Sequence, residues 1–125
     1  MIKENTGSVS FNIESVSFNV QVAIVIRSVR TALGWNQRDL AAASMLSKPT
    51  IARIESLVIS PRGDTINALL NAFRRVGVEI EILTDEVRVI YKKEALILVQ
   101  KALLNSKKTD VDENTAVEEG LQLFD

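Results

Sequence analysis

Between residues 20 and 76, apolar side chains recur every three or four positions, which is the spacing of one face of an α-helix. The clearest stripe consists of Ile66, Leu69, Leu70 and Phe73. Shorter stripes of the same kind precede it, and polar residues fill the positions between them. The pattern predicts four helices, at about 20–33, 37–44, 48–55 and 65–76.

Residues with strong preferences for helix ends stand at these boundaries. Asn36, Ser47 and Asp64 each precede a predicted helix, where a short polar side chain can accept a hydrogen bond from a free backbone N–H group. Gly34 and Gly77 follow predicted helices, where glycine readily adopts the left-handed conformation that ends a helix. The end signals therefore agree with the apolar spacing.

After Gly77 the spacing of apolar residues changes from about 3.6 to about 2. Two short runs, 78–82 and 87–91, have an apolar or aromatic residue at every second position, and Thr84-Asp85-Glu86 separates them, so a β-hairpin is predicted. Residues 94–105 form a further predicted helix, which is almost wholly apolar between Ala95 and Val99. So wide an apolar surface predicts burial against another element.

The N-terminal region is ambiguous. Residues 8–13 alternate polar and apolar side chains and predict a strand. The pentapeptide Ser-Val-Ser-Phe-Asn at 8–12 recurs at 15–19. The second copy either continues the strand after a bulge near Glu14 or starts the first helix, because a seven-residue spacing also suits a helix. A chance repeat is the third interpretation, and the sequence leaves all three open.

The composition excludes several kinds of chemistry. With 46% hydrophobic and 25% charged residues, the 125-residue chain can bury a core. It contains no Cys and no His, which removes disulfides, thiol nucleophiles, metal sites ligated by Cys or His, and the most common general base. We therefore expect no enzymatic activity, no metal site and no cofactor. The longest apolar run, 22–26, is far shorter than the ~20 residues that cross a bilayer, which favours a cytoplasmic protein.

A formal net charge of −1 hides a strong asymmetry along the chain. From Ile24 to Arg75 there are eight basic and three acidic residues, a net charge of +5. From Thr109 to Asp125 there are six acidic residues and no basic one. The basic middle is typical either of a surface that binds a polyanion or of a solvated helical surface. The acidic end predicts a loose, solvated tail.

The two short helices at 37–44 and 48–55 are separated by a tight turn. Apolar residues stand where two steeply crossing helices must meet, at Leu40, Ala41, Leu46, Ile51 and Ile54. The small Ala41 allows the second helix to approach closely. Such a crossing directs the N-terminal end of 48–55 outward, where it fits a DNA major groove about 12 Å wide.

These residues, with Gly34-Trp35-Asn36-Gln37 before them and Pro61 after them, resemble the Cro/repressor (XRE-like) helix-turn-helix family in order and spacing. The resemblance covers about Ile24 to Val78. It implies a mainly α fold with a small β component. The expected architecture is a five-helix-type repressor domain with short N- and C-terminal strands and a C-terminal helix, present as a dimer.

The resemblance also implies which residues contact double-stranded DNA. The base-reading residues are expected on the helix 48–55, at Lys48, Pro49, Thr50 and Arg53. Contacts that position the DNA backbone are expected from Asn36, Gln37, Ser56 and Arg62. The alternative is that these polar residues only cap helices or lie on a solvated surface.

Glu55 is expected to pair with Arg27 or Arg30 inside the fold, because DNA phosphates repel a carboxylate. Two positions depart from the family pattern. Met45 stands where the family has a glycine of positive φ, which predicts strain of ~1 kcal/mol or an altered turn. The loop after Ser56 is apolar at 57–59, which weakens its role as a phosphate contact and suggests packing against the terminal elements.

A single recognition helix reads only a few base pairs, so we expect a homodimer. The residues predicted to hold the two copies together are Val78, Ile80, Ile82, Val87, Val89, Leu96, Val99 and Leu103. A strand directly after the last helix of the domain resembles a feature of antitoxins of the kinase-toxin type, which pair it across their dimer. The alternative is a hairpin that covers the core of one monomer.

Two functions remain open at this point. The first is a homodimeric, sequence-specific DNA-binding repressor, and the second is an antitoxin that binds a protein toxin and autoregulates its operon. The expected organisation is an N-terminal strand or arm at 1–19, the helix-turn-helix domain at 20–77, a dimerisation region at 78–106 and an acidic, flexible tail at 107–125.

Overall fold

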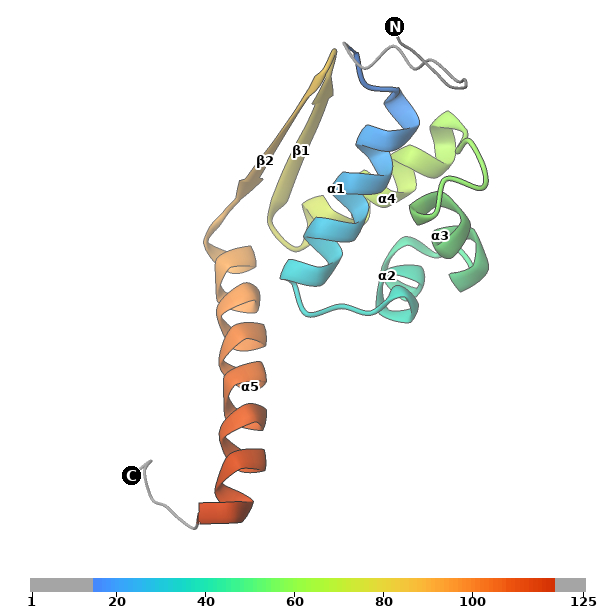
Figure 1. Cartoon of the computed structure of the whole chain (residues 1–125). Helices are drawn as coiled ribbons and strands as arrows, with labels where there is room; N and C mark the ends of the chain where they lie inside the picture. The colour runs from blue at the N-terminus through green and yellow to red at the C-terminus, as the bar shows by residue number, and fades with distance from the viewer. Residues whose placement is uncertain (1–14, 119–125) are drawn as a thin grey trace, which may run out of the picture.

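The computed structural model describes residues 15–118, with side chains described as far as residue 107. Within that part of the chain, four helices pack around one apolar core, and a two-stranded sheet and a long fifth helix follow them (Figure 1). This arrangement confirms the predicted fold class, mainly α with a small β component. The predicted strand at 8–13 lies outside the described residues.

The central helix is α1 (Phe18–Ala32), which contacts α3 and both strands of the sheet. Ser17 caps it, since its side-chain oxygen accepts a hydrogen bond from the backbone N–H of Val20 at 3.1 Å. The second copy of the repeated pentapeptide is therefore the start of this helix and not the continuation of a strand. The inward face of α1 is fully buried at Val22, Val25, Ile26 and Val29.

Three shorter helices complete the body of the molecule: α2 (Gln37–Ser44), α3 (Lys48–Glu55) and α4 (Gly63–Arg75). They bury Leu40, Ile51, Ile54, Leu69 and Phe73 in one core together with the inward face of α1. The rings of Trp35 and Phe73 stack with their centroids 6.0 Å apart, so the loop after α1 is held to α4. Trp35 is thus partly buried against the core.

The start of α4 differs from the sequence prediction. Asp64 was expected to cap it, but the helix begins at Gly63, and Arg62 takes the capping position without a side-chain hydrogen bond. Asp64 instead lies in the first turn, where a negative charge is favoured by the positive end of the helix dipole.

The predicted hairpin is confirmed. Strand β1 (Val78–Leu83) pairs antiparallel with β2 (Glu86–Tyr91), with Val78 opposite Tyr91 and Leu83 opposite Glu86. Asp85 in the turn has a φ of 59°. The side-chain amide of the buried Gln21 donates to the backbone carbonyls of Leu83 and Glu86 at 2.8 and 3.1 Å, which fixes the hairpin end against α1.

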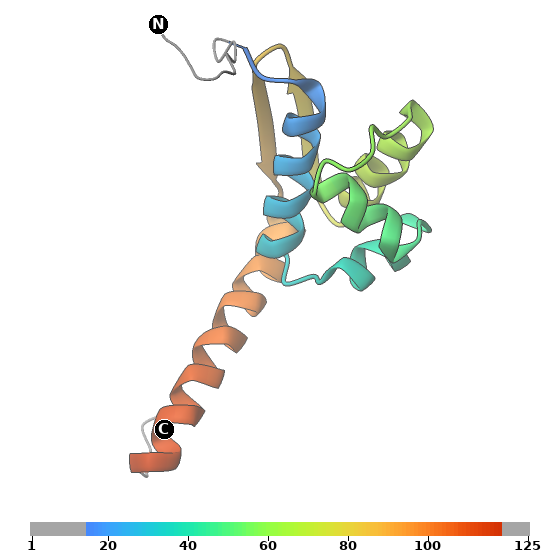
Figure 2. The same ribbon diagram turned by 45° about the vertical axis from the view of Figure 1, so that its right-hand side comes forward.

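Helix α5 (Lys93–Glu118) leaves the hairpin and projects from the body (Figures 1 and 2). The sequence predicted that this helix ends near residue 105 and that a loose acidic tail begins at 107. The helix instead continues to Glu118, so the first part of the predicted tail is helical and only 119–125 lie outside the described residues. The polar residues after 105 contain neither Gly nor Pro before 118, and nothing in their backbone chemistry stops a helix.

Two glycines allow the close approach of α5 to the body. Gly77 has a φ of 95°, and a Cβ atom there would lie 2.6 Å from the Cγ atom of Glu94. Gly34 has a φ of 79°, and a Cβ atom there would lie 2.8 Å from the Cβ atom of Ala102. Both positions therefore need glycine for two reasons, the left-handed backbone and the space. No helix in the described part of the chain has the length and apolar character to span a membrane.

Candidate nucleic-acid interface

The turn between α2 and α3 sets the angle between these two helices. Asn36 and Asp39 form a reciprocal capping box at the start of α2, each side chain accepting a hydrogen bond from the backbone N–H of the other. At the end of α2, Met45 adopts the left-handed conformation with a φ of 62°. The positive φ predicted where the family has glycine is thus present here in a methionine, and its side chain is 89% exposed.

Helix α3 begins at Lys48 and presents one face to solvent. Ser47 caps it by accepting a hydrogen bond from the backbone N–H of Thr50 at 3.2 Å, and the missing N–H of Pro49 costs nothing in the first turn. Lys48, Pro49 and Arg53 are exposed, whereas Ile51 and Ile54 on the opposite side are fully buried. The side chains of α3 are thus divided into a face held by the core and a face free to enter a groove.

Thr50 differs from the other predicted base-reading residues. It is half-buried, and its hydroxyl lies 2.8 Å from the hydroxyl of Ser47, within the cap of its own helix. The structure therefore brings Lys48, Pro49 and Arg53 together on an open surface, with Thr50 at its edge. The capping role that was the alternative interpretation for Thr50 is observed.

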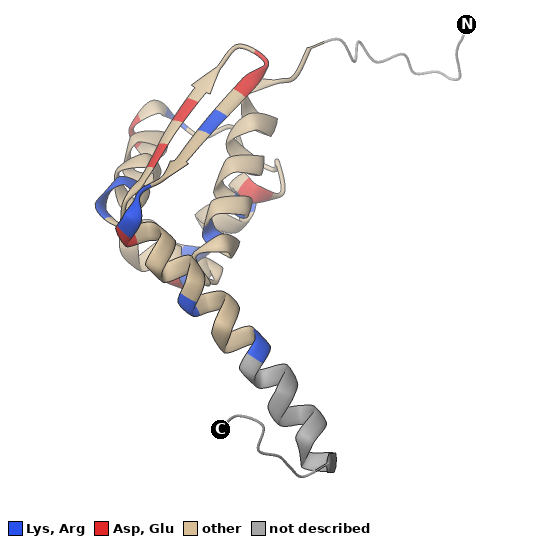
Figure 3. Cartoon of the chain, turned by 90° about the vertical axis from the view of Figure 1, so that its left-hand side faces the viewer, with Lys and Arg blue, Asp and Glu red and all other residues tan. Residues whose placement is uncertain are grey.

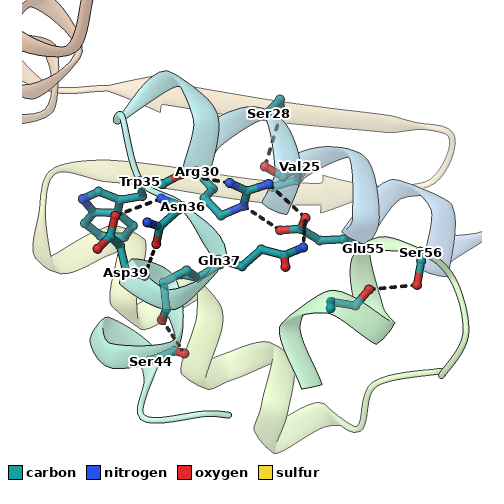
Figure 4. Close-up of polar contacts among 12 residues, drawn as sticks. Val25, Ser28, Arg30, Trp35, Asn36, Gln37, Asp39, Ser44, Glu55 and Ser56 are labelled. Atoms are coloured by element: carbon teal, nitrogen blue, oxygen red, sulfur yellow. Dashed lines mark hydrogen bonds and ion pairs between the residues drawn. The ribbon is translucent and has the colours of Figure 1, made fainter. Parts of the chain in front are cut away.

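A buried carboxylate connects α1, α2 and α3 (Figure 4). Arg30 donates from Nε and Nη2 to the two carboxylate oxygens of Glu55, at 2.8 and 3.0 Å. Arg30 also donates from Nη1 to the backbone carbonyl of Trp35 at 2.9 Å. Gln37 donates from Nε2 to Glu55 Oε1 at 3.0 Å. Glu55 is a buried anion at the end of α3, and its hydrogen bonds to Arg30 and Gln37 attach that helix to α1 and α2.

The expected pairing of Glu55 is thereby confirmed, with Arg30 and not Arg27 as the partner. Gln37 was expected to contact phosphate and to brace the recognition helix. The structure shows the brace, because the Gln37 amide is hydrogen-bonded to the last residue of α3. Gln37 stays half-buried at the first position of α2, so one side of its amide faces the protein.

The other predicted positioning residues lie around α3 at the surface. Asn36 is exposed and uses its side chain in the cap of α2. Ser56 is exposed, and its hydroxyl donates to the backbone carbonyl of Ala52 at 2.8 Å (Figure 4). Arg62 has a side chain that is 84% exposed and lies 3.8 Å from Asp64. Arg38 was not among the residues predicted from the sequence. It is also exposed, and it adds positive charge in the first turn of α2.

The loop after α3 corrects one expectation. Leu57, Val58 and Ile59 were expected to pack against the terminal elements, but they are 50%, 68% and 36% exposed. The backbone explains this orientation: Leu57 has a φ of 65°, and the N–H of Val58 donates to the carbonyl of Arg53 at 2.8 Å. The loop thus closes on the end of α3 and turns its apolar side chains outward.

The residues predicted to form the dimer interface fall into two groups. Val78 is buried, and Ile80, Ile82, Val87 and Val89 pack against the core of their own chain. Val99 on α5 is likewise partly buried against this core. Leu96 and Leu103 are exposed, at 53% and 64%. For the strand residues, the alternative of a hairpin that covers the core of its own monomer therefore describes the structure.

Comparison with known proteins agrees with this geometry. Residues 26–79 match a family model described as helix-turn-helix, which spans α1 from Ile26 to the start of β1. No curated protein matches the chain.

Proposed function

We propose that the protein is a homodimeric repressor that reads a palindromic operator through the major groove, because residues 26–79 match a family model described as helix-turn-helix. Lys48 and Arg53 donate hydrogen bonds to guanine O6 and N7 atoms in this proposal. Asn36, Gln37, Ser56 and Arg62 position the duplex through its phosphates. In this proposal the protein acts in the cytoplasm, where it has access to the operator DNA.

The observation that carries the proposal is the exposed face of α3. Lys48, Pro49 and Arg53 share it, and the buried pair of Glu55 with Arg30 holds the helix from the other side. Because contacts with the core already order α3, its exposed face can enter a groove without a further loss of conformational entropy in the helix. The surrounding segment is basic, which attracts a polyanion and steers its approach.

Two copies are required for tight and specific binding, because one α3 contacts only a few base pairs. Two copies related by a two-fold axis read half-sites about 34 Å apart, or a multiple of that distance. Bound across a promoter, such a dimer excludes RNA polymerase. Repression is the simplest consequence of the arrangement.

The direct test is a gel shift and footprint on the DNA that adjoins the protein's own gene, followed by selection from a random duplex library. We expect an inverted repeat to be protected and selected. A reporter gene under that promoter should be expressed less when the protein is present. A selected site without any inverted repeat would contradict binding by a two-fold homodimer. Increased expression of the reporter would contradict repression.

Two sequence features favour the antitoxin alternative: the strand after the last helix of the domain, and the acidic C-terminal sequence, since such a segment can fold on a partner. That strand, β1, pairs with β2 of the same chain. The acidic sequence remains as support for this alternative. Co-purification of the product of a neighbouring gene with the tagged full chain would favour it over a repressor that acts alone.

A further inference from the structure

Helix α5 carries an apolar surface that the described residues do not cover. Four aliphatic side chains on it are exposed: Leu96 at 53%, Ile97 at 42%, Leu103 at 64% and Leu104 at 57%. We refer to these four residues as the α5 patch. The other side of the helix packs on the body of the same chain through Ala95, which is fully buried, and Leu98. In Figure 3, the ribbon of this half of α5 is mostly tan, the colour of uncharged residues, with a few basic positions between.

The α5 patch is symmetric about Gln100. Leu96 and Leu104 lie four residues before and after it, and Ile97 and Leu103 lie three residues before and after it. Steps of three and four residues keep side chains on one face of an α-helix. Gln100, which is exposed, therefore lies at the centre of the patch and on the same face.

We propose that the α5 patch is the surface where two copies of this chain meet, with the two α5 helices antiparallel about a two-fold axis at Gln100. The inference rests on the homodimer proposed above and gives it a surface and an orientation. In a two-fold contact, residue i meets residue j and residue j meets residue i. Leu96 then meets the partner's Leu104, and Ile97 meets the partner's Leu103.

Gln100 has a specific part in this contact. On the two-fold axis its amide faces the partner's Gln100, and each amide has both donors and an acceptor with which to bond the other. A polar pair at the centre of an apolar contact between helices fixes their register, because any shift leaves it without a partner. The apolar residues supply the attraction, and Gln100 selects one alignment.

The antiparallel direction follows from the symmetry of the α5 patch about Gln100. In an antiparallel contact centred on Gln100, Lys93 lies opposite the partner's Lys107, at the two ends of the patch where water and salt screen their charges. Lys93 and Lys107 flank the α5 patch, and their long side chains carry the ammonium groups out to solvent.

The hairpin is the competing surface for a second copy. Its inward row of apolar residues already packs on the core. Its outward face carries charges of both signs, with Arg88 2.9 Å from Glu86 and 3.9 Å from Glu81 (Figure 3). Ile90 lies on that face with 54% of its surface exposed, almost the same fraction as Leu96. It therefore provides a matched control.

The first experiment is light scattering coupled to size exclusion of the full chain, with circular dichroism to verify folding. We expect a dimer for the wild type and for Ile90→Glu. Leu103→Glu should raise the dissociation constant at least about tenfold, because it places a charge in an apolar contact. A Leu103→Glu protein that stays dimeric, or an Ile90→Glu protein that dissociates, overturns the assignment to α5. A monomeric wild type overturns it together with the proposed homodimer.

The second experiment determines direction, and the absence of cysteine from the chain makes it clean. Differently tagged Leu96→Cys and Leu104→Cys proteins are mixed and oxidised. Antiparallel helices give a mixed disulfide between the two variants, whereas parallel helices join each variant to itself and overturn the inference. A gel shift on a single half-site reports DNA binding by one domain, so a failure of the α5 dimer is distinguishable from a failure of DNA recognition.

Discussion

The two carboxylate oxygens of Glu55 accept hydrogen bonds from Nε and Nη2 of Arg30, at 2.8 and 3.0 Å, in a position where the Glu55 side chain is only 5% exposed. This contact joins the last turn of α1 to the last residue of α3. Helix α3, which presents Lys48 and Arg53, is thus attached to the central helix α1 by a buried ion pair in which each charge compensates the other. The orientation of α3 therefore depends on Glu55, which is buried on the side of the helix away from Lys48 and Arg53.

Replacing Arg30 with methionine should therefore destabilise the domain strongly. The substitution leaves Glu55 as a buried carboxylate with Gln37 as its remaining side-chain partner, and the loss expected for such a group is about 3 kcal/mol. Urea unfolding followed by circular dichroism measures it. Arg62→Met is the control, because Arg62 is 84% exposed and should change the free energy of unfolding by less than about 0.5 kcal/mol. Equal losses for the two variants would show that the Glu55 contact does not hold α3.

Arg53 and Arg62 should respond differently to a change of DNA sequence. Arg53→Ala removes a donor from the exposed face of α3, and we expect it to lose about 1–3 kcal/mol of discrimination at one base pair of the selected site. Arg62→Ala should weaken binding to every duplex by a similar factor, because phosphate contacts carry no sequence information. Competition gel shifts with single-base variants of the site measure both. A uniform loss for Arg53→Ala would remove it from the base-reading set.

Binding should weaken steeply as salt is added, because each phosphate contact releases counterions from the DNA. A plot of log affinity against log salt concentration should be linear, and Arg62→Ala should reduce its slope by about 1. Leu83→Ala, at a side chain on the hairpin away from α3, should leave the slope unchanged. Fluorescence anisotropy over a range of potassium chloride concentrations gives the three slopes. Identical slopes for Arg62→Ala and the wild type would exclude a phosphate contact at this residue.

The domain was predictable in detail because its signals are local. Asn36, Ser47 and Gly34 mark helix ends through hydrogen bonds and backbone angles that involve only a few neighbouring residues. The partner of Glu55 was also foreseeable, since an acid beside a DNA-binding helix needs a cation within the protein. The exposed face of α3 followed from the same helical spacing that buries Ile51 and Ile54.

The region after Gly77 was less predictable. An apolar pattern indicates that a surface is covered, but it does not identify the element that covers it. Ile80 and Val89 alternate as a half-buried strand does, whether the covering surface belongs to the same chain or to a second one. They cover their own core. On α5, Leu98 faces the body and Leu103 faces outward, and a continuous apolar run contains no signal that separates the two. The end of α5 was missed for the opposite reason, since its last turns are too polar to show any stripe.

Met45→Gly should stabilise the protein by about 0.5–1 kcal/mol. Met45 is left-handed, with a φ of 62°, and its side chain is 89% exposed, so the substitution relieves strain and gives up little packing. Two variants separate this cause from any general effect of glycine: Met45→Ala retains the strain and should gain nothing, and Ala42→Gly, at an exposed site inside α2, should lose about 1 kcal/mol. Urea unfolding of the three proteins gives the comparison. If Met45→Gly were as unstable as Ala42→Gly, the turn between α2 and α3 would have no need of a left-handed residue, and the angle at which α3 is presented would have to be set elsewhere.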